Sequence, residues 1–179
     1  MKNKIKLPDK VSAITPFLVM DILEKAKIMA ARGEDIVHLE VGEPDFDTPL
    51  SVREAAKEAI DRGKTGYAPS LGLPELREAI SDDYEARYGV KIDPGRVIVT
   101  SGSSPALQMI FASLIEERDE VIMSDPHYAC YANFVKFFGG RPRYAKSGES
   151  VAFRMNSDAV SAEISERTKA ILLNLSLIH

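Results

Sequence analysis

Residues 97–108 read Val-Ile-Val-Thr-Ser-Gly-Ser-Ser-Pro-Ala-Leu-Gln. The β-branched run 97–100 predicts a strand, the small residues 101–104 predict a turn, and the apolar pattern that follows predicts a helix to about Ile115. The start of a helix offers free backbone N–H groups and the positive end of the helix dipole, and here it also offers serine hydroxyls. The stretch therefore predicts a cup that suits a phosphate group.

This cup has a second interpretation, because serine is a favoured cap for any helix. Neither of the two common nucleotide-binding loops is present. The pattern Gly-x-Gly-x-x-Gly is absent, and no Gly-Lys-Ser/Thr follows the predicted strand. The stretch alone leaves open whether it binds a phosphate or only caps a helix.

Predicted strands and helices alternate from residue 97 to the end of the chain. After the opening strand and helix, the expected elements are strand 121–123, helix 128–138, strand 143–145, helix 157–166 and strand 169–174. This alternation predicts an α/β fold, a mainly parallel sheet with helices on both faces. Ligands of such sheets bind beyond the carboxyl ends of the strands.

The first part of the chain shows helix signals more than strand signals. Its expected elements are helices near 16–32, 49–61 and 74–88, with one strand at 36–41. Thr15-Pro16 and Thr48-Pro49 each predict an N-cap followed by a proline in the first helical position. The turns 42–47, 101–104 and 125–128 all follow predicted strands, so we expect them to face one cleft.

Composition and charge exclude several classes of function. The 179 residues are 45% hydrophobic and 28% charged, which is ordinary for a soluble globular protein, and the net charge of −4 favours neither nucleic acid nor an anionic membrane as a partner. No stretch reaches the ~20 apolar residues of a membrane helix, and the amino terminus does not resemble a signal peptide. The only cysteine, Cys130, fits a reducing compartment. We therefore expect a cytoplasmic protein with neither nucleic-acid nor membrane partners.

Other chemical constellations are weak. Asp45 and Asp47 have no histidine or third carboxylate at ligand spacing, so no metal site is expected. His127 follows a predicted strand but has no acidic partner in the sequence, and no Ser/His/Asp or Cys/His arrangement is visible. Tyr67 and Tyr128, each taken alone, are typical structural aromatics.

Taken together and in order, the motifs resemble the class I/II aminotransferases, the fold type I enzymes that depend on pyridoxal 5'-phosphate. The matching segments are 14–17, 39–49, 66–67, 72–80, 100–104, 119–122, 125–131 and 167–171. The resemblance covers roughly residues 14–174 and implies the N-terminal part of that fold.

The resemblance implies a role for the cup and for one tyrosine. Gly102, Ser103 and Ser104 would hold the phosphate of pyridoxal phosphate with hydroxyl and backbone N–H groups. Tyr128 would stack on the pyridine ring of the cofactor, because an aromatic side chain offers it a flat surface.

The resemblance also implies substrates and a partner. Gly42 would present its backbone to the substrate carboxylate, and Tyr67 would reach into a neighbouring subunit to bind the phosphate of its cofactor. The family moves an amino group between an amino acid and a 2-oxo acid, so we expect those small molecules as substrates and a homodimer in the full-length protein.

The family pattern stops after Asn174. The aspartate at the ring nitrogen, the lysine that holds the cofactor covalently and the arginine that pairs with the substrate follow later in the family, so no residue here is assigned as catalytic. We expect residues 1–47 to form an arm and small-domain segment, and 48–174 to form a truncated cofactor-binding domain. Residues 175–179 look like a non-native tail, because they resemble a translated sequencing adapter.

The sequence therefore predicts an N-terminal aminotransferase fragment that is inactive alone. Two alternatives stay open: a β-lyase or related synthase that uses the same cofactor and fold, and a short phosphate-binding protein without catalytic activity. Re-reading the DNA across codon 174 would distinguish the fragment from the short protein.

Overall fold

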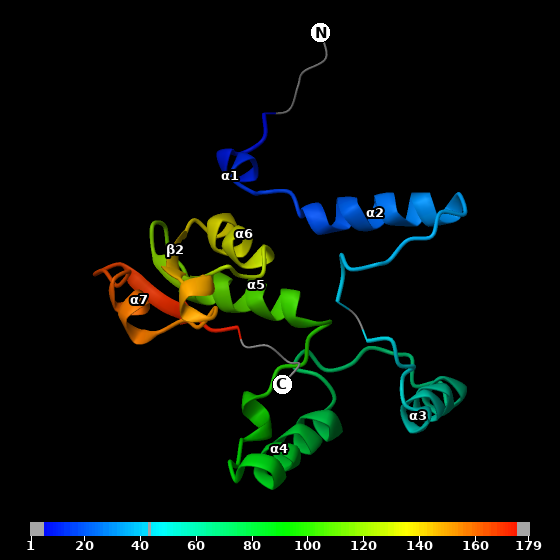
Figure 1. Ribbon diagram of the computed structural model, residues 1–179. Coiled ribbons are helices and arrows are strands. Elements are labelled where there is room, and N and C mark those ends of the chain that lie inside the picture. The colour runs from blue at the N-terminus through cyan, green and yellow to red at the C-terminus, as the bar shows by residue number, and fades with distance from the viewer. Residues whose placement is uncertain (1–5, 43, 175–179) are drawn as a thin grey trace. The chain divides into compact units, whose positions relative to one another are not determined.

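The computed structural model describes residues 6–42 and 44–174, and Figure 1 shows their arrangement along the chain. The helices are α1 (Asp9–Ser12), α2 (Leu18–Ala31), α3 (Leu50–Asp61), α4 (Pro74–Tyr88), α5 (Ser103–Leu114), α6 (Cys130–Phe137) and α7 (Ser157–Ser161), with 3-10 turns η1 (Pro94–Arg96) and η2 (Glu149–Val151). The strands are β1 (Glu120–Asp125), β2 (Arg141–Lys146) and β3 (Thr168–Leu172).

The chain divides into two compact units. The sheet unit consists of the described residues up to Glu40 together with those from Ser104 onward, and the helical unit is Val41–Ser103. The domain boundary expected between residues 47 and 48 stays a prediction. The expected tail, 175–179, lies outside the described residues.

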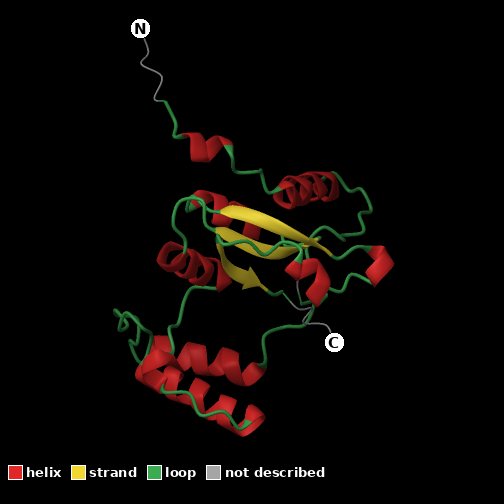
Figure 2. Ribbon diagram, turned by 90° about the vertical axis from the view of Figure 1, so that its left-hand side faces the viewer, coloured by secondary structure: helices red, strands yellow, loops and turns green. Residues whose placement is uncertain are grey.

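A three-stranded parallel sheet forms the centre of the sheet unit, with the order β2-β1-β3 (Figure 2). In the register, Glu120 lies opposite Arg141 on β2, and Met123 lies opposite Leu172 on β3. The connection from β1 to β2 runs through α6, as parallel neighbours require. The predicted α/β fold with a parallel sheet is confirmed.

The core lies on β1, whose apolar run is buried on both faces. Val121 and Met123 have no exposed surface and belong to one cluster with Phe111, Ile115, Ala132 and Val135 from α5, α6 and the turn after α5. Ile122 points to the opposite face of the sheet and is also fully buried. A central parallel strand covered on both faces explains why this segment is a continuous apolar run and does not alternate with polar residues.

In the helical unit, α4 has the boundaries that its local signals predict. Pro74 is the first residue of α4, and Gly89 ends the helix with a left-handed φ of +65°. The Asp93 carboxylate accepts the N–H of Gly95 at 2.8 Å and so caps η1. The Arg77 guanidinium donates to the Pro94 carbonyl at 3.0 Å, which ties η1 to α4.

Two predicted strands, 36–41 and 97–100, are not strands in the structure. A strand needs a neighbouring strand to pair with, and none of the described strands lies alongside either segment. In the second segment the Val99 N–H instead donates to the carbonyl of Leu71 at 3.0 Å.

The two predicted threonine caps are also wrong. α2 begins at Leu18 after Phe17, and α3 begins at Leu50 after Pro49, neither with a side-chain cap. Near α2, the reason lies in a long-range contact: the Thr15 backbone is hydrogen-bonded to Asn133 on α6. α7 ends at Ser161, which is earlier than the expected 166.

Candidate functional site

The predicted phosphate cup is a turn closed by Thr100. The Thr100 hydroxyl donates to the Gly102 carbonyl at 2.6 Å, and the Gly102 N–H donates to the Thr100 carbonyl at 2.8 Å. Gly102 has a φ of +93°, a conformation that side chains rarely adopt. The glycine therefore turns the chain from the extended segment into α5.

Ser103 and Ser104 are the first two residues of α5, and both are exposed. The residue before the helix is Gly102, which has no side chain, so the serines lie inside the first helical turn and not at the capping position. The first turn carries no acidic residue. Exposed hydroxyls, free N–H groups and no carboxylate in that turn make a donor set that fits a phosphate group.

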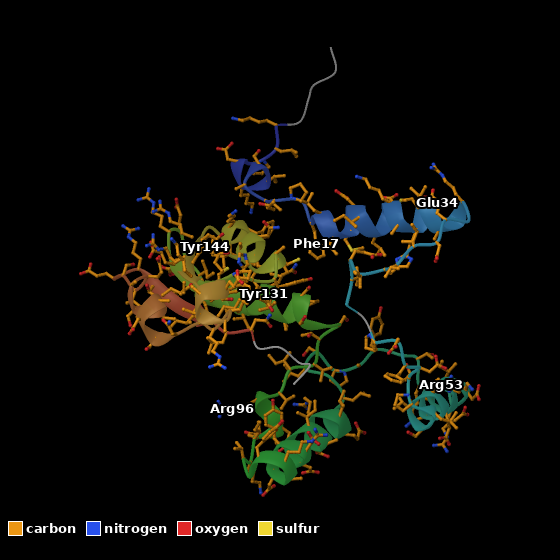
Figure 3. All side chains as sticks on the ribbon, viewed as in Figure 1. Phe17, Glu34, Arg53, Arg96, Tyr131 and Tyr144 are labelled. Atoms are coloured by element: carbon orange, nitrogen blue, oxygen red, sulfur yellow. The ribbon has the colours of Figure 1, made fainter. Side chains whose placement is uncertain are left out.

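Tyr128 belongs to the sheet unit, two residues before α6. Its ring lies 5.7 Å from that of Phe17 at 79°, and 5.2 Å from that of Tyr131 at 71°; Figure 3 labels Phe17 and Tyr131. The pKa of the Tyr128 hydroxyl is raised, mainly by the Cys130 side chain and to a smaller extent by partial burial, so the phenol is neutral around pH 7. With 43% of its surface exposed, Tyr128 keeps room for a ligand ring.

The other two predicted site residues lie in the helical unit. Tyr67, in the loop between α3 and α4, is fully exposed, so no residue in the described part of the chain packs against its ring. A Cβ built on Gly42 meets no atom within 4 Å, so nothing described here requires a glycine at that position. Their roles toward substrate and neighbouring subunit stay predictions.

Sequence reasoning missed a pocket of about 310 Å³ in the sheet unit. Thr15, Asn133 and Lys136 contribute to its walls. At its edge, the His127 ring stacks on Tyr144 at 5.3 Å and 25°, and the buried Nδ1 of His127 has no partner among the described residues. Thr15 and Asn133 are 118 positions apart, so no local sequence signal indicates this pocket.

Neither a metal centre nor a membrane-spanning helix is present in residues 6–42 and 44–174. These residues contain no group of three or more His, Cys, Asp or Glu side chains placed to hold a metal ion. In the same part of the chain, no helix has the length and apolar character needed to cross a membrane.

The family profile described as "Aminotransferase class I and II" matches residues 34–175. The chain belongs to this family. It is 38% identical over 168 residues to a probable aspartate/prephenate aminotransferase of Aquifex aeolicus, and 37% identical over 170 residues to an aspartate aminotransferase of Bacillus subtilis. These matches cover 94% and 95% of this chain but 43% of each relative, so the chain spans less than half the length of either.

A solved structure of aspartate aminotransferase from Thermus thermophilus with maleate matches at a TM-score of 0.89 and 36% identity. The match covers 95% of this chain and 44% of that chain. The fold is therefore an aminotransferase fold, and it is incomplete compared with that solved structure.

Proposed function

We propose that this chain supplies the phosphate-binding and ring-binding part of a pyridoxal-phosphate-dependent aminotransferase. The observation that carries the proposal is the exposed donor cup at the start of α5, in a chain of the aminotransferase family. When bound, pyridoxal phosphate acts as an electron sink for the amino acid and carries the amino group between substrates.

The proposed roles of the residues follow from their chemistry. Ser103 and Ser104 donate hydroxyl and backbone hydrogen bonds to the phosphate, and Gly102 provides the turn that exposes them. Tyr128 lies against the pyridine ring as a neutral aromatic. Gly42 leaves space for a substrate carboxylate beside the backbone.

The exposure of Tyr67 supports the proposal that the full-length protein is a homodimer. A fully exposed tyrosine in a loop can extend beyond its own subunit, and in our proposal it donates to the cofactor phosphate of the partner. The substrates in this proposal are an amino acid and a 2-oxo acid. Both curated relatives carry aspartate in their names and the solved one holds maleate, so aspartate is the first amino donor to test. The cytoplasmic location stays a prediction.

The test replaces both cup serines by alanine in the full-length protein and measures the affinity for pyridoxal phosphate by equilibrium dialysis. Hydrogen bonds to a charged group contribute about 1.5–3 kcal/mol each, so losing two weakens binding by roughly a hundredfold or more. Ser113→Ala is the matched control, because its hydroxyl donates to the Ile110 carbonyl at the other end of α5. Equal affinity in the double variant and the control would remove the cup from the proposal.

The chain by itself has no assigned catalytic residue, and we propose that it does not transaminate alone. The purified chain is incubated with aspartate, 2-oxoglutarate and pyridoxal phosphate, and glutamate formation is measured beside a protein-free control. Turnover above the control would contradict this part of the proposal.

A further inference from the structure

The carboxamide of Asn133 holds the segment before α2 on α6. The Thr15 N–H donates to Asn133 Oδ1 at 3.0 Å, and Asn133 Nδ2 donates to the Thr15 carbonyl at 2.8 Å. Both polar ends of one side chain are thus paired with both polar groups of one backbone residue. The next residue, Pro16, has no N–H to contribute, so the amide donor in this contact comes from Thr15.

The same segment carries the aromatic neighbour of Tyr128. Phe17 is two residues after Thr15, and its ring stands at 79° to the Tyr128 ring with centroids 5.7 Å apart. The second neighbour, Tyr131, is on α6 and stands at 71° to Tyr128. The Tyr128 ring is therefore held between one aromatic from α6 and one from the segment that Asn133 holds.

A second contact ties this segment to the same helix. The Lys10 ammonium lies 4.6 Å from the centre of the Phe137 ring on α6. This contact is exposed and lies five residues before Thr15, so it brings the segment near α6 without fixing where Phe17 lies. The Asn133 contact is closer to Phe17 and has directional bonds, which fix the backbone more tightly.

We propose that Asn133 is a positioning residue for Tyr128. By pairing with the Thr15 backbone it fixes Phe17 against Tyr128, and this sets the angle at which the Tyr128 ring meets a cofactor ring. The proposal rests on the stacking role of Tyr128 in the proposed function. Offset and edge contacts between rings are sensitive to angle, so loss of Asn133 changes how Tyr128 meets its partner without removing any group that touches it.

The experiment uses the full-length protein and the variants Asn133→Ala and Asn133→Asp. The aspartate keeps an acceptor for the Thr15 N–H but has no donor for the Thr15 carbonyl. Asn156→Ala is the matched control, because it removes a carboxamide that accepts the Ala159 N–H at 2.8 Å as the cap of α7, elsewhere in the sheet unit. Phe17→Leu removes the aromatic contact and leaves both Asn133 bonds in place.

The first readouts are made on the cofactor-free protein. Loss of the two Asn133–Thr15 hydrogen bonds speeds hydrogen exchange of the Thr15 amide about tenfold in Asn133→Ala, which corresponds to the net free energy that these bonds contribute. The increase is smaller in Asn133→Asp, which keeps one of the two bonds. The Tyr128 ring resonance, assigned with Tyr128→Phe, shifts in Asn133→Ala and in Phe17→Leu. Phe17→Leu leaves Thr15 exchange unchanged, and Asn156→Ala changes neither quantity.

The last readout is the visible circular dichroism of bound pyridoxal phosphate, which reports the orientation of the cofactor and not the rate of turnover. We expect it to change in Asn133→Ala and Phe17→Leu and to match the native protein in Asn156→Ala. A Tyr128 resonance in Asn133→Ala and Asn133→Asp equal to that of the control overturns the positioning role. A native protein that binds no cofactor overturns the proposed function instead, while the Tyr128 resonance still decides the role of Asn133 toward that ring.

Discussion

Replacing Gly72 by alanine tests the close packing of the loop before α4 against the segment that leads to the phosphate cup. Gly72 has a φ of +97°, and a Cβ built on it lies 2.7 Å from both Cβ and Cγ2 of Val99. The two segments are also joined by the Val99 N–H, which donates to the Leu71 carbonyl at 3.0 Å. A methyl group at position 72 must therefore separate them or distort the turn.

The cost has two parts. Alanine in a left-handed backbone conformation costs about 1–2 kcal/mol, and forcing an extra methyl group into a packed contact costs about 1–3 kcal/mol. Gly72→Ala should thus lower the free energy of unfolding by about 2–5 kcal/mol. Gly89→Ala is the control: Gly89 also has a positive φ, +65°, but a Cβ built there meets no atom within 4 Å. The control should lose only the backbone part.

Urea unfolding followed by far-ultraviolet circular dichroism measures both losses. The difference between the variants, about 1–3 kcal/mol, corresponds to a shift of roughly 1 M in the urea midpoint at an ordinary slope. Equal midpoints for the two variants would refute the close approach of Gly72 to Val99. A loss in both that exceeds the backbone part would show that the left-handed turns, and not the contact, dominate.

Three further predictions concern the sheet unit. Val135→Ala removes two methyl groups from a fully buried side chain and should cost about 2 kcal/mol in urea unfolding; a loss below ~0.5 kcal/mol would contradict its place in the core. The Glu116 N–H, together with Lys169 nearby, lowers the pKa of the Asp119 carboxyl, so this carboxylate stabilises the fold near pH 7 and the effect disappears as the pH falls through the lowered pKa. Asp119→Asn should therefore be less stable at neutral pH and show a flatter acid limb in a pH series of thermal unfolding; identical acid limbs would count against it. Burial and the Asp125 carboxylate raise the pKa of the Tyr144 hydroxyl. The neutral phenol therefore contributes fully to the free energy of unfolding below about pH 10, and this contribution is lost as the pH rises through the raised pKa. Tyr144→Phe should remove this alkaline loss of stability, and an unchanged alkaline limb in the pH series would reject this role of Tyr144.

The sequence predicts those parts of the fold that depend on neighbouring residues. Pro74 and Gly89 mark the two ends of α4 because a proline fits the first helical turn and a glycine accepts the left-handed conformation. Asp93 caps η1 through a bond two residues away. The central strand, β1, contains the apolar run 121–123, because a parallel strand buried on both faces needs apolar residues on both.

The parts that could not be predicted depend on distant residues. Segment 97–100 has the residues of a strand, but pairing is decided by what lies beside it and not by its own composition. The residues next to Asn133 in the sequence do not indicate that its partner is Thr15, 118 positions earlier. The contact of Phe17 with Tyr128 depends on that pairing and was missed for the same reason.

The pairing of Thr15 with Asn133 cannot form until the ribosome has synthesised residue 133. A ribosome that adds about 5–20 residues per second needs roughly 6 to 24 seconds to proceed from codon 15 to codon 133, the 118 positions that separate the partners. Throughout that interval the segment before α2 has no α6 to bind, and Phe17 lacks its aromatic neighbour Tyr128. Translation speed between these two codons should therefore influence how much newly made protein reaches the folded state, and slow codons there should increase its dependence on chaperones.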